Sequence, residues 1–436
     1  MRIEAQLAEL GMSREAARSR AAMFERVRAA LGGEGGAFGV WAPGRIELLG
    51  KHVDYGGGRS IVTAVERGFC FVARPREDER LIVTDVEAGQ AVECRINGKQ
   101  AADVRGLGNY VSTVARRVAR NFAGPLRGAD VAFVSDLPVA AGLSSSSALV
   151  VGIFRVLDRV NGLRERAEYR EAIDSCEELG EYLGAVENGR SFGALEGDRG
   201  VGTLGGNQDQ TAILCCEAGR ISRFGYLPAR REGTLAVPDG VTFVVAASGV
   251  EAAKTGAAME RYNRASRLLS EVLAVWNRET GRTDATLMQA LARSPDAIDR
   301  LRSILRRHGD AALSDRFEHF VAEVFEIVPS AWDAWASADW EEFGQIVDRS
   351  QAGAERLLGN QAEETVFLAR GARASGAIAA SAFGAGFGGS VWAMVRKDES
   401  PEFLARWRAA YGERFPRHRD RSAFFATGAG PAAIVV

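Results

Sequence analysis

A serine- and glycine-rich stretch carries the residue types and the spacing that bind phosphate groups: Leu137–Ala148, with the sequence LPVAAGLSSSSA. It follows a predicted strand over residues 128–135 and leads into a predicted helix over residues 148–160. A helix start offers unpaired backbone N–H groups and the positive end of the helix dipole. Gly142 allows the backbone to approach a ligand closely, and the serine hydroxyls add donors or a metal ligand. The same stretch could instead provide a serine cap for an ordinary helix.

Two further turns combine glycines with polar side chains or with flanking strands. The first, Trp41–Gly58, contains Arg45 at a Pro-Gly break and a polar turn with the sequence GKHVDYGGG. The second, residues 383–389, reads FGAGFGG. The chain has no Walker A sequence, and no acidic residue follows the second turn at the spacing of a dinucleotide-binding fold. Each turn alone says little about function, but three such turns in one chain indicate a ligand site.

Hydrophobic patterning predicts the elements that must position these turns. Helices are predicted over residues 4–30, 109–122, 148–160, 166–186, 252–280, within 285–358, and over 363–374 and 402–411. Strands are predicted over residues 38–49 with a break at 43–44, and over 69–73, 81–85, 91–96, 128–135, 241–247, 376–381, 390–395, 423–427 and 432–436. Because strands and helices are mixed without strict βαβ alternation, the pattern predicts an α+β fold rather than a doubly wound parallel sheet.

Length and composition restrict the class of protein. The chain has 436 residues, which is long for a single core, and we predict two domains, residues 1–232 and 233–436. A formal net charge of -2 argues against a nucleic-acid partner. The five cysteines form no CxxC pair, so neither a disulfide framework nor a zinc site is expected.

The N-terminal residues and the apolar runs of the sequence indicate the cellular location that we expect. The N-terminal residues lack the apolar core of a signal peptide, and no run approaches the roughly 20 apolar residues that span a bilayer. We therefore expect a cytoplasmic protein with no membrane partner. We also expect a monomer or a weak homo-oligomer, with small molecules as its partners.

Three segments together resemble the GHMP sugar and metabolite kinases. Trp41–Tyr55 (WAPGRIELLGKHVDY) is similar to the galactokinase signature, and Leu137–Ala148 resembles the family's PxxxGLSSSA phosphate-binding motif. Residues 381–390 resemble the family's third motif, a glycine-rich turn. The three occur in the family's order. Segments 109–111, 207–210 and 261–264 are also similar to galactokinase segments, so the resemblance covers nearly the whole chain after residue 37.

This resemblance implies a fold and an activity. The implied fold is an N-terminal α+β domain followed by a C-terminal ferredoxin-like α+β domain, with the active site in the cleft between them. The implied activity is the transfer of the ATP γ-phosphoryl group to the anomeric hydroxyl of galactose or a related sugar, with Mg²⁺. A kinase for another sugar, such as a uronic acid or L-arabinose, stays open as an alternative. So does a non-catalytic sugar and ATP sensor on the same fold.

The resemblance also implies residue roles. Asp209 matches the family's catalytic aspartate, which takes or orients the proton of the attacking hydroxyl, and Arg45 matches the arginine beside that hydroxyl. The implied sugar contacts are His52, Asp54 and Tyr262, to which we add Glu47 and Lys51 as substrate-binding positions. The implied ATP-binding residues are Gly142, Leu143, Ser144, Ser145, Ser146, Gly384, Gly386 and Gly388, and the implied Mg²⁺ ligands are Ser146 and Glu187. Glu187 could instead be a solvated acid at a helix end.

Two positions depart from the family's pattern. Glu47 stands where the family usually has Asn, and Lys51 stands where it has Glu. In galactokinases that Glu accepts a hydrogen bond from a sugar hydroxyl, whereas an ammonium group only donates. Lys51 would suit a substrate carboxylate, which favours a uronic acid, or the substrate could be a pentose that lacks the group. Alternatively, Glu47 pairs with Lys51 and substrate choice is unchanged. The other histidines, His308, His319 and His418, are predicted to lie at the surface.

Overall fold

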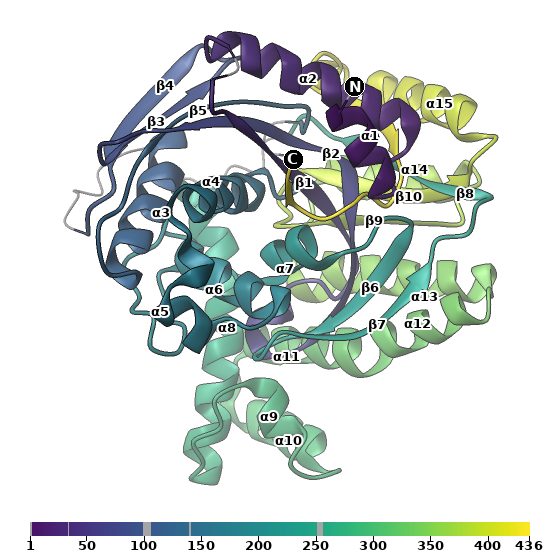
Figure 1. Cartoon of the computed structure of the whole chain (residues 1–436). Helices are drawn as coiled ribbons and strands as arrows, with labels where there is room; N and C mark the ends of the chain where they lie inside the picture. The colour runs from purple at the N-terminus through teal and green to yellow at the C-terminus, as the bar shows by residue number, and fades with distance from the viewer. Residues whose placement is uncertain (1, 34, 99–105, 139–140, 251–255) are drawn as a thin grey trace.

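Two β-sheets and the helices around them form the molecule (Figure 1). The computed structural model describes residues 2–33, 35–98, 106–138, 141–250 and 256–436. Residues 139–140 of the serine-rich stretch and residues 252–255 of a predicted helix fall outside the described residues. The mixture of mainly antiparallel sheets and packed helices confirms the α+β class.

The larger sheet carries the first glycine-rich turn. Its strand order is β12-β1-β2-β5-β3-β4, with β6 paired to β2 and β7 paired to β6; every pair is antiparallel except β3 with β5. The bounds are β1 (Phe38–Leu49), β2 (Arg59–Pro75), β3 (Arg80–Asp85), β4 (Gln90–Arg95), β5 (Ala129–Ser135), β6 (Arg220–Gly225), β7 (Arg230–Ala236) and β12 (Ile434–Val435).

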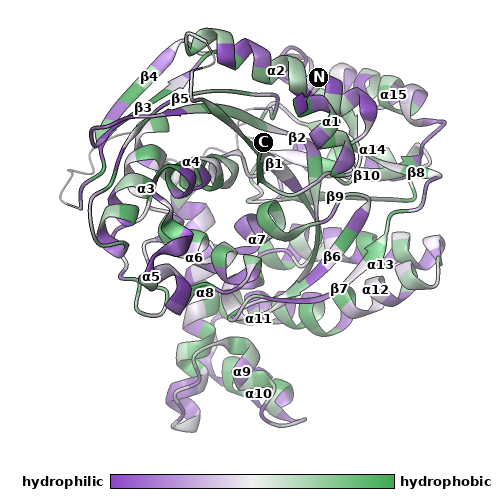
Figure 2. Ribbon diagram, viewed as in Figure 1, coloured by the Kyte–Doolittle hydropathy of each residue, from purple (hydrophilic) through white to green (hydrophobic). Residues whose placement is uncertain are grey.

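Helices cover both faces of this sheet because successive strand residues point to opposite sides. Trp41 and Cys70 pack under α1 (Arg2–Glu9) and α2 (Arg14–Ala30), whereas Val40 and Phe71 face the opposite helices. Those helices are α3 (Leu107–Asn121), α4 (Ser145–Asn161), α5 (Ala167–Ala172), α6 (Cys176–Asn188) and α7 (Gln208–Cys215). Buried hydrophobic residues of α4 and of the central strands belong to one core. Figure 2 shows the central strands largely in the hydrophobic colour.

The smaller sheet has the strand order β11-β8-β10-β9, all antiparallel. Its strands are β8 (Val241–Ala247), β9 (Ala379–Phe383), β10 (Ser390–Arg396) and β11 (Ala423–Thr427). Numbered within the sheet this is the order 4-1-3-2, the ferredoxin-like arrangement that the family resemblance implies. The helices α14 (Glu363–Ala374) and α15 (Ser400–Arg414) cover one face, and the other face shares a hydrophobic core with the larger sheet through Phe243 and Trp392.

The remaining helices form a third cluster that reaches the first glycine-rich turn. They are α8 (Gly256–Thr280), α9 (Leu287–Leu291), α10 (Ala297–His308), α11 (Ala311–Val321), the π-helical segments Ala322–Ile327 and Ala354–Leu358, α12 (Val328–Ala336) and α13 (Trp340–Gly353). The core of α8 to α11 includes Val53 and contacts Tyr55. In Figure 1, α9 and α10 project from the body of the molecule. Across the described residues, no helix has the length and apolarity that crossing a membrane requires.

Two predicted helices are each divided in the structure. The predicted helix 4–30 is α1 and α2, because Gly11 adopts a left-handed φ of 90° and Ser13 then caps α2. The predicted helix 166–186 is α5 and α6, because Ser175 and Glu178 form a capping box that starts α6. Both interruptions use cap residues that lie inside an otherwise helical pattern.

Three strand predictions are also corrected. The expected break at 43–44 is a bulge within a continuous β1, and β2 is much longer than the predicted 69–73. The strands β6 and β7 were not predicted, because charged residues interrupt their alternation. The predicted domain boundary at residue 232 falls within β7, which belongs to the larger sheet, and the chain passes to the smaller sheet between β7 and β8. The division into domains 1–232 and 233–436 stays a prediction.

Close packing of α4 on β2 depends on Gly152. A Cβ at this position would lie 2.2 Å from the Phe71 ring. We expect Gly152→Ala to lower the free energy of unfolding by about 2 kcal/mol through overpacking. Gly371 lies within α14 with open space around it, so Gly371→Ala should instead raise stability by about 1 kcal/mol through helix propensity. Urea denaturation measures both, and a Gly152→Ala protein as stable as the parent would contradict this packing.

Candidate active site

The three glycine-rich turns meet around one cavity of about 870 Å³. Side chains from β1, the turn after it, α6, α7 and α8 also line it. Of the residues assigned from sequence, those that line it are Arg45, Glu47, His52, Asp54, Gly142, Ser144, Ser145, Ser146, Glu187, Asp209, Tyr262 and Gly384. Lys51, Leu143, Gly386 and Gly388 do not line it. Segments far apart in the chain therefore converge on a single space.

Arg45 and Asp209 form an ion pair in the cavity wall. Arg45 Nε donates to Asp209 Oδ1 at 2.8 Å, Nη2 lies 2.7 Å from the same oxygen, and Nη1 donates to the Gly142 carbonyl at 2.6 Å. The Arg45 side chain is 3% exposed and that of Asp209 is 22% exposed. The guanidinium therefore lies behind the carboxylate, and the carboxylate is the group that a ligand can reach. A positioned carboxylate of this kind can accept a proton from a hydroxyl.

The serine-rich stretch leaves the start of α4 open to the cavity. Gly142 and Ser144 both have left-handed backbones, with φ of 76° and 61°. Ser144 makes no side-chain capping bond to α4, so the simple serine-cap interpretation is wrong. Ser144 lines the cavity, and its buried hydroxyl has no hydrogen-bond partner among the described residues. Open N–H groups and an unpaired hydroxyl at a helix start suit a phosphate.

The third glycine-rich turn supports this loop from the other sheet. A Cβ at Gly384 would lie 2.7 Å from the Gly142 carbonyl oxygen, and Ser390 Oγ donates to the Ala141 carbonyl at 2.5 Å. Gly386 instead packs against Asn360, Gly388 packs against Val250, and Leu143 is buried in the core. These three residues do not line the cavity, and their assignment as ATP-binding residues stays a prediction.

Oxygen atoms cluster beside Asp209. Ser147 Oγ donates to Glu187 Oε2 at 2.8 Å and lies 3.5 Å from Asp209 Oδ2, and Ser146 Oγ lies 3.4 Å from Glu187 Oε1. Gln210 Nε2 donates to Glu187 Oε2 at 2.6 Å, while its buried Oε1 has no partner in the described part of the chain. Glu187 is 5% exposed, so it is not a solvated helix-end acid. Sequence reasoning missed Ser147 and Gln210, although both adjoin residues that it assigned.

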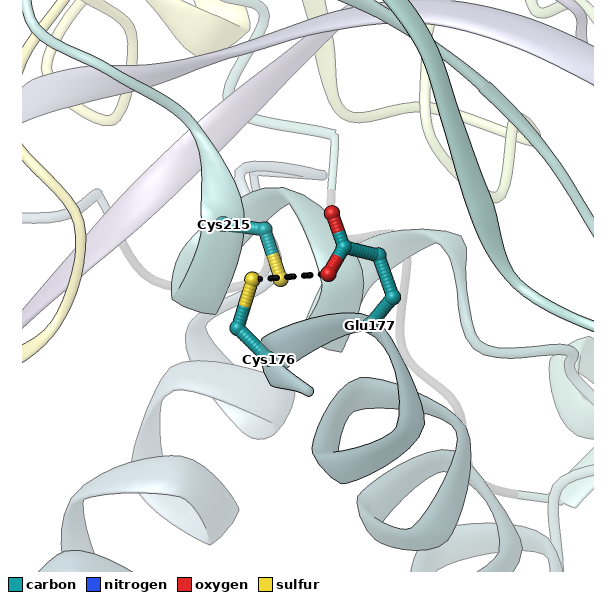
Figure 3. A group of neighbouring side chains, drawn as sticks. All are labelled: Cys176, Glu177 and Cys215. Atoms are coloured by element: carbon teal, nitrogen blue, oxygen red, sulfur yellow. Dashed lines mark hydrogen bonds between the residues drawn. The ribbon is translucent and has the colours of Figure 1, made fainter. Parts of the chain in front are cut away.

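A second group of potential metal ligands lies outside the cavity (Figure 3). The ligand atoms of Cys176, Glu177 and Cys215 lie within 4.8 Å of one another. Cys176 donates to Glu177 Oε2 at 3.0 Å, Arg231 donates to Glu177 Oε1 at 3.3 Å, and burial raises the pKa of Cys215 well above its usual range. The carboxylate is thus already paired, and sulfur ligands suit Mg²⁺ poorly because it prefers oxygen ligands. The oxygen cluster beside Asp209 is the better match for Mg²⁺.

The turn after β1 presents buried polar groups to the cavity. Glu47 is 4% exposed; Oε2 accepts from Gln208 Nε2 at 2.7 Å, and burial raises its pKa to about 7. Asp54 accepts from the Gln208 backbone N–H at 3.2 Å, and burial raises its pKa to about 6. Burial lowers the pKa of His52 to about 4, so its ring is neutral near pH 7.

The partners of His52 indicate its tautomer. Nε2 lies 3.3 Å from the Ala385 carbonyl, which only accepts, so Nε2 carries the proton. Nδ1 then accepts from the Tyr55 hydroxyl at 3.2 Å. The Tyr262 ring lies 5.7 Å from the His52 ring, centroid to centroid, and completes this side of the cavity.

Lys51 does not face the cavity, which corrects the hypothesis that it contacts the substrate. It is 1% exposed, and its Nζ donates to Ser350 Oγ at 2.6 Å rather than to Glu47. Ser350 Oγ in turn donates to Glu323 Oε1 at 2.5 Å, and Glu323 Oε2 accepts from the Gly50 N–H at 2.9 Å. A carboxylate 272 positions away in the chain thus compensates the Lys51 charge.

Arg316 holds the same turn from α11. It is 1% exposed and donates to the His52 carbonyl, to the Tyr55 hydroxyl at 3.2 Å and to the Ala265 carbonyl at 3.2 Å. His319 lies beside it and is 1% exposed, so its predicted surface position is wrong; His418 is 7% exposed and is also buried. We call Arg316, Glu323 and Ser350 the clasp. Sequence motifs could not identify it, because its residues belong to helices of unremarkable composition.

Three models of related kinase families match separate parts of the chain. Residues 28–75 match the galactokinase galactose-binding signature, 109–191 the GHMP kinases N terminal domain, and 333–413 the GHMP kinases C terminal domain. A galactokinase of Chloroflexus aggregans is 29% identical over 391 residues, covering 86% of this chain and 88% of that protein. A galactokinase of Streptomyces coelicolor is 28% identical over 375 residues, covering 85% and 87%.

Solved structures share the fold. The galactokinase of Lactococcus lactis complexed with galactose superposes with a TM-score of 0.78 at 22% identity, covering 95% of this chain and 99% of that chain. The Methanococcus jannaschii mevalonate kinase has a TM-score of 0.54 at 13% identity, covering 91% and 99%.

The pairing of Lys51 with the clasp predicts a large effect on stability. Lys51→Ala should lower the free energy of unfolding by about 3 kcal/mol, because it leaves the Glu323 carboxylate buried without a cation. The double variant Lys51→Met with Glu323→Gln should recover part of that loss. Lys397→Ala, at an exposed position, is the matched control and should change stability by less than about 0.5 kcal/mol. Equal effects of Lys51→Ala and Lys397→Ala in chemical denaturation would contradict the pairing.

Burial of Glu47 predicts a pH-dependent stability difference. The unfolded chain ionises this group as the pH rises through 4.5, but the folded protein keeps the proton until about 7. Glu47 therefore lowers stability increasingly across that window, by up to about 3 kcal/mol. Glu47→Gln should match the parent near pH 4.5 and be more stable at pH 8. Denaturation at both pH values measures the difference, and a gap that does not grow with pH would refute the burial argument.

Proposed function

Because the chain belongs to the GHMP kinase family, we propose that it transfers the γ-phosphoryl group of ATP to the anomeric hydroxyl of galactose or a closely related neutral sugar. The observation that carries the proposal is the Arg45–Asp209 pair, which lies between the polar turn after β1 and the phosphate-type loop before α4. A carboxylate between a hydroxyl-binding turn and a phosphate-binding helix start is placed for phosphoryl transfer to an alcohol. The relatives named galactokinase support galactose as the first acceptor to test.

The proposed reaction uses Asp209 and Arg45 together. Asp209 accepts the proton of the attacking hydroxyl as its oxygen approaches the γ-phosphorus. The guanidinium of Arg45 fixes the carboxylate and stabilises negative charge that develops on the acceptor oxygen and the transferred group. The N–H groups at the start of α4 and the hydroxyl of Ser144 bind the phosphates. Positioning and electrostatics supply the catalysis, as this reaction class requires.

Mg²⁺ fits the oxygen cluster beside Asp209. Glu187 and Ser146 are the proposed ligands, and the unpaired Oε1 of Gln210 is a third oxygen in the same place. When bound, the ion neutralises phosphate charge and orients the γ-phosphoryl group. Acidic side chains outnumber arginines in the cavity lining, so a bound cation would offset their charge and that of the phosphates. The acidic residues are Glu47, Asp54, Asp85, Glu87, Asp136, Glu187 and Asp209, and the arginines are Arg45 and Arg67.

Two alternatives have weaker support. A non-catalytic sensor would not need Arg45 and Asp209 in a bonded pair at the cavity wall. A uronic acid acceptor was suggested by Lys51, whose ammonium is bound to Ser350 outside the cavity. L-arabinose stays in the test panel. A cytoplasmic location and a monomeric or weakly associated state stay predictions.

The proposal is tested by ATP consumption with a panel of galactose, L-arabinose and galacturonate. We expect turnover with a neutral sugar and little with galacturonate. Sugar binding without turnover would favour the sensor, and turnover with galacturonate alone would overturn the proposed acceptor.

Two variants test the proposed roles. Asp209→Asn should lower kcat by about 10²- to 10⁴-fold while ATP still binds, because the amide cannot accept the proton. Arg45→Ala should lower kcat more than it raises KM, because its charge matters most as the hydroxyl ionises. Asp339→Asn, which caps α13 equally well, is the matched control and should leave kcat unchanged. Near-normal turnover by Asp209→Asn would remove Asp209 as the base.

A further inference from the structure

We propose that Cys176, Glu177 and Cys215 bind a thiophilic divalent metal ion such as Zn²⁺, at a site outside the cavity where α6 begins and α7 ends. The proposed phosphoryl transfer does not use this group, so the inference goes beyond the proposed function. The two sulfur atoms and one carboxylate oxygen lie within 4.8 Å of one another. Figure 3 shows these three atoms directed toward one another.

The packing of α6 on α7 places the two cysteines opposite each other. A Cβ at Gly184 would lie 2.6 Å from Asn207 Cβ. A Cβ at Gly180 would lie 2.8 Å from Thr211 Oγ1. The two helices therefore run antiparallel at close approach, and each step of four residues, about one helical turn, moves the contact to the next pair. One further step along each helix reaches the first residue of α6 and the last residue of α7, which are the two cysteines. Helix register thus holds the thiols together.

The separations of the ligand atoms are close to those of tetrahedral coordination. Zn²⁺ binds thiolate sulfur at about 2.3 Å and carboxylate oxygen at about 2.1 Å, so its ligand atoms lie about 3.6 to 3.8 Å apart. Cys176 Sγ lies 3.0 Å from Glu177 Oε2, and Cys215 Sγ is within 4.8 Å of the other ligand atoms. Shifts of about 1 Å therefore suffice to form a site with three protein ligands, with water in the fourth position.

Arg231 balances the charge of the bound state. Its Nε donates to Glu177 Oε1 at 3.3 Å, whereas Oε2 faces the thiols. Each thiol loses its proton to solvent when the metal binds, so the hydrogen bond from Cys176 to Glu177 is replaced by a bond from each residue to the metal. Two thiolates and one carboxylate then carry three negative charges, which the divalent ion and the guanidinium offset. Burial raises the pKa of Cys215 because an isolated thiolate is poorly solvated there, and a directly bound cation removes that penalty.

A dissolved ion can reach this group from one side. Cys176 is half-buried and the Glu177 side chain is 15% exposed, whereas Cys215 is 3% exposed. Thiolate ligands favour Zn²⁺ over Mg²⁺, so this group and the oxygen cluster beside Asp209 suit different ions. The cysteine spacing in the sequence does not indicate the site, because its ligands come from two helices.

Titration of the full chain with Cd²⁺ tests the proposal, with a phosphine reductant keeping the thiols reduced and Mg²⁺ in large excess. Cd²⁺ is the probe because its bonds to thiolate produce an ultraviolet charge-transfer band. We expect one equivalent per chain to produce the band, and Zn²⁺ to displace the Cd²⁺ and to raise the Tm. Cys176→Ser and Cys215→Ser should each weaken binding about tenfold or more, and Glu177→Gln should weaken it less.

Cys216→Ser is the matched control. Cys216 adjoins Cys215 in the sequence, but its thiol donates to the Val62 carbonyl at 3.9 Å, so this variant should bind Cd²⁺ as the parent does. A parent protein without the band would overturn the proposal, as would a band that survives in both Cys176→Ser and Cys215→Ser or one that excess Mg²⁺ abolishes. Circular dichroism checks that each variant is folded. If the buried Cys215→Ser does not fold, the result for the half-buried Cys176→Ser decides.

Discussion

The buried guanidinium of Arg45 is the interaction on which the cavity depends. It bonds to Asp209 at the start of α7 and to the Gly142 carbonyl in the phosphate-type loop, and it lies 5.7 Å from the centre of the Phe383 ring in the third turn. A buried cation is tolerated only when it is fully paired, so β1, α7 and the loop before α4 must adopt one relative arrangement. The same pairing presents the Asp209 carboxylate in a fixed position. The contacts that stabilise this wall of the cavity therefore also fix the position of the proposed base.

The clasp gives the polar turn after β1 the same rigidity. Arg316, Glu323 and Ser350 come from helices of the second half of the chain and bind the backbone or side chains of residues 50–55. His52 has a left-handed φ of 56°, which is uncommon for a residue other than glycine. The bond from Arg316 to its carbonyl stabilises that conformation and so orients the ring toward the cavity. Residues that line the cavity are therefore positioned by partners that do not line it.

Much of the fold and the composition of the site followed from local sequence. The three glycine-rich turns identified the cavity because their chemistry is local: glycines permit close approach, and a serine run before a helix provides donors. The ferredoxin-like order of the second sheet also agreed with its implied family. The expectations that the structure does not support concern residues whose contacts lie far away in the sequence. Lys51 was assigned to the substrate because it stands in the polar turn where the family has Glu. Its compensating charge, Glu323, lies far away in the chain and could not be foreseen. His319 was placed at the surface because its helix looks charged, although that face packs on the polar turn. Gly386 packs against Asn360 and Gly388 packs against Val250, so close packing by itself requires glycine at both positions.

The central claim is that Arg45 holds Asp209 where it meets the attacking hydroxyl. The most direct measurement is a crystal structure of the protein with galactose and a non-hydrolysable ATP analogue. The account predicts the anomeric oxygen within about 3.2 Å of an Asp209 carboxylate oxygen and facing the γ-phosphorus, with the Arg45–Asp209 bonds intact. An anomeric oxygen that contacts neither Asp209 nor Arg45, or an Arg45 side chain that leaves Asp209 when the ligands bind, would contradict it.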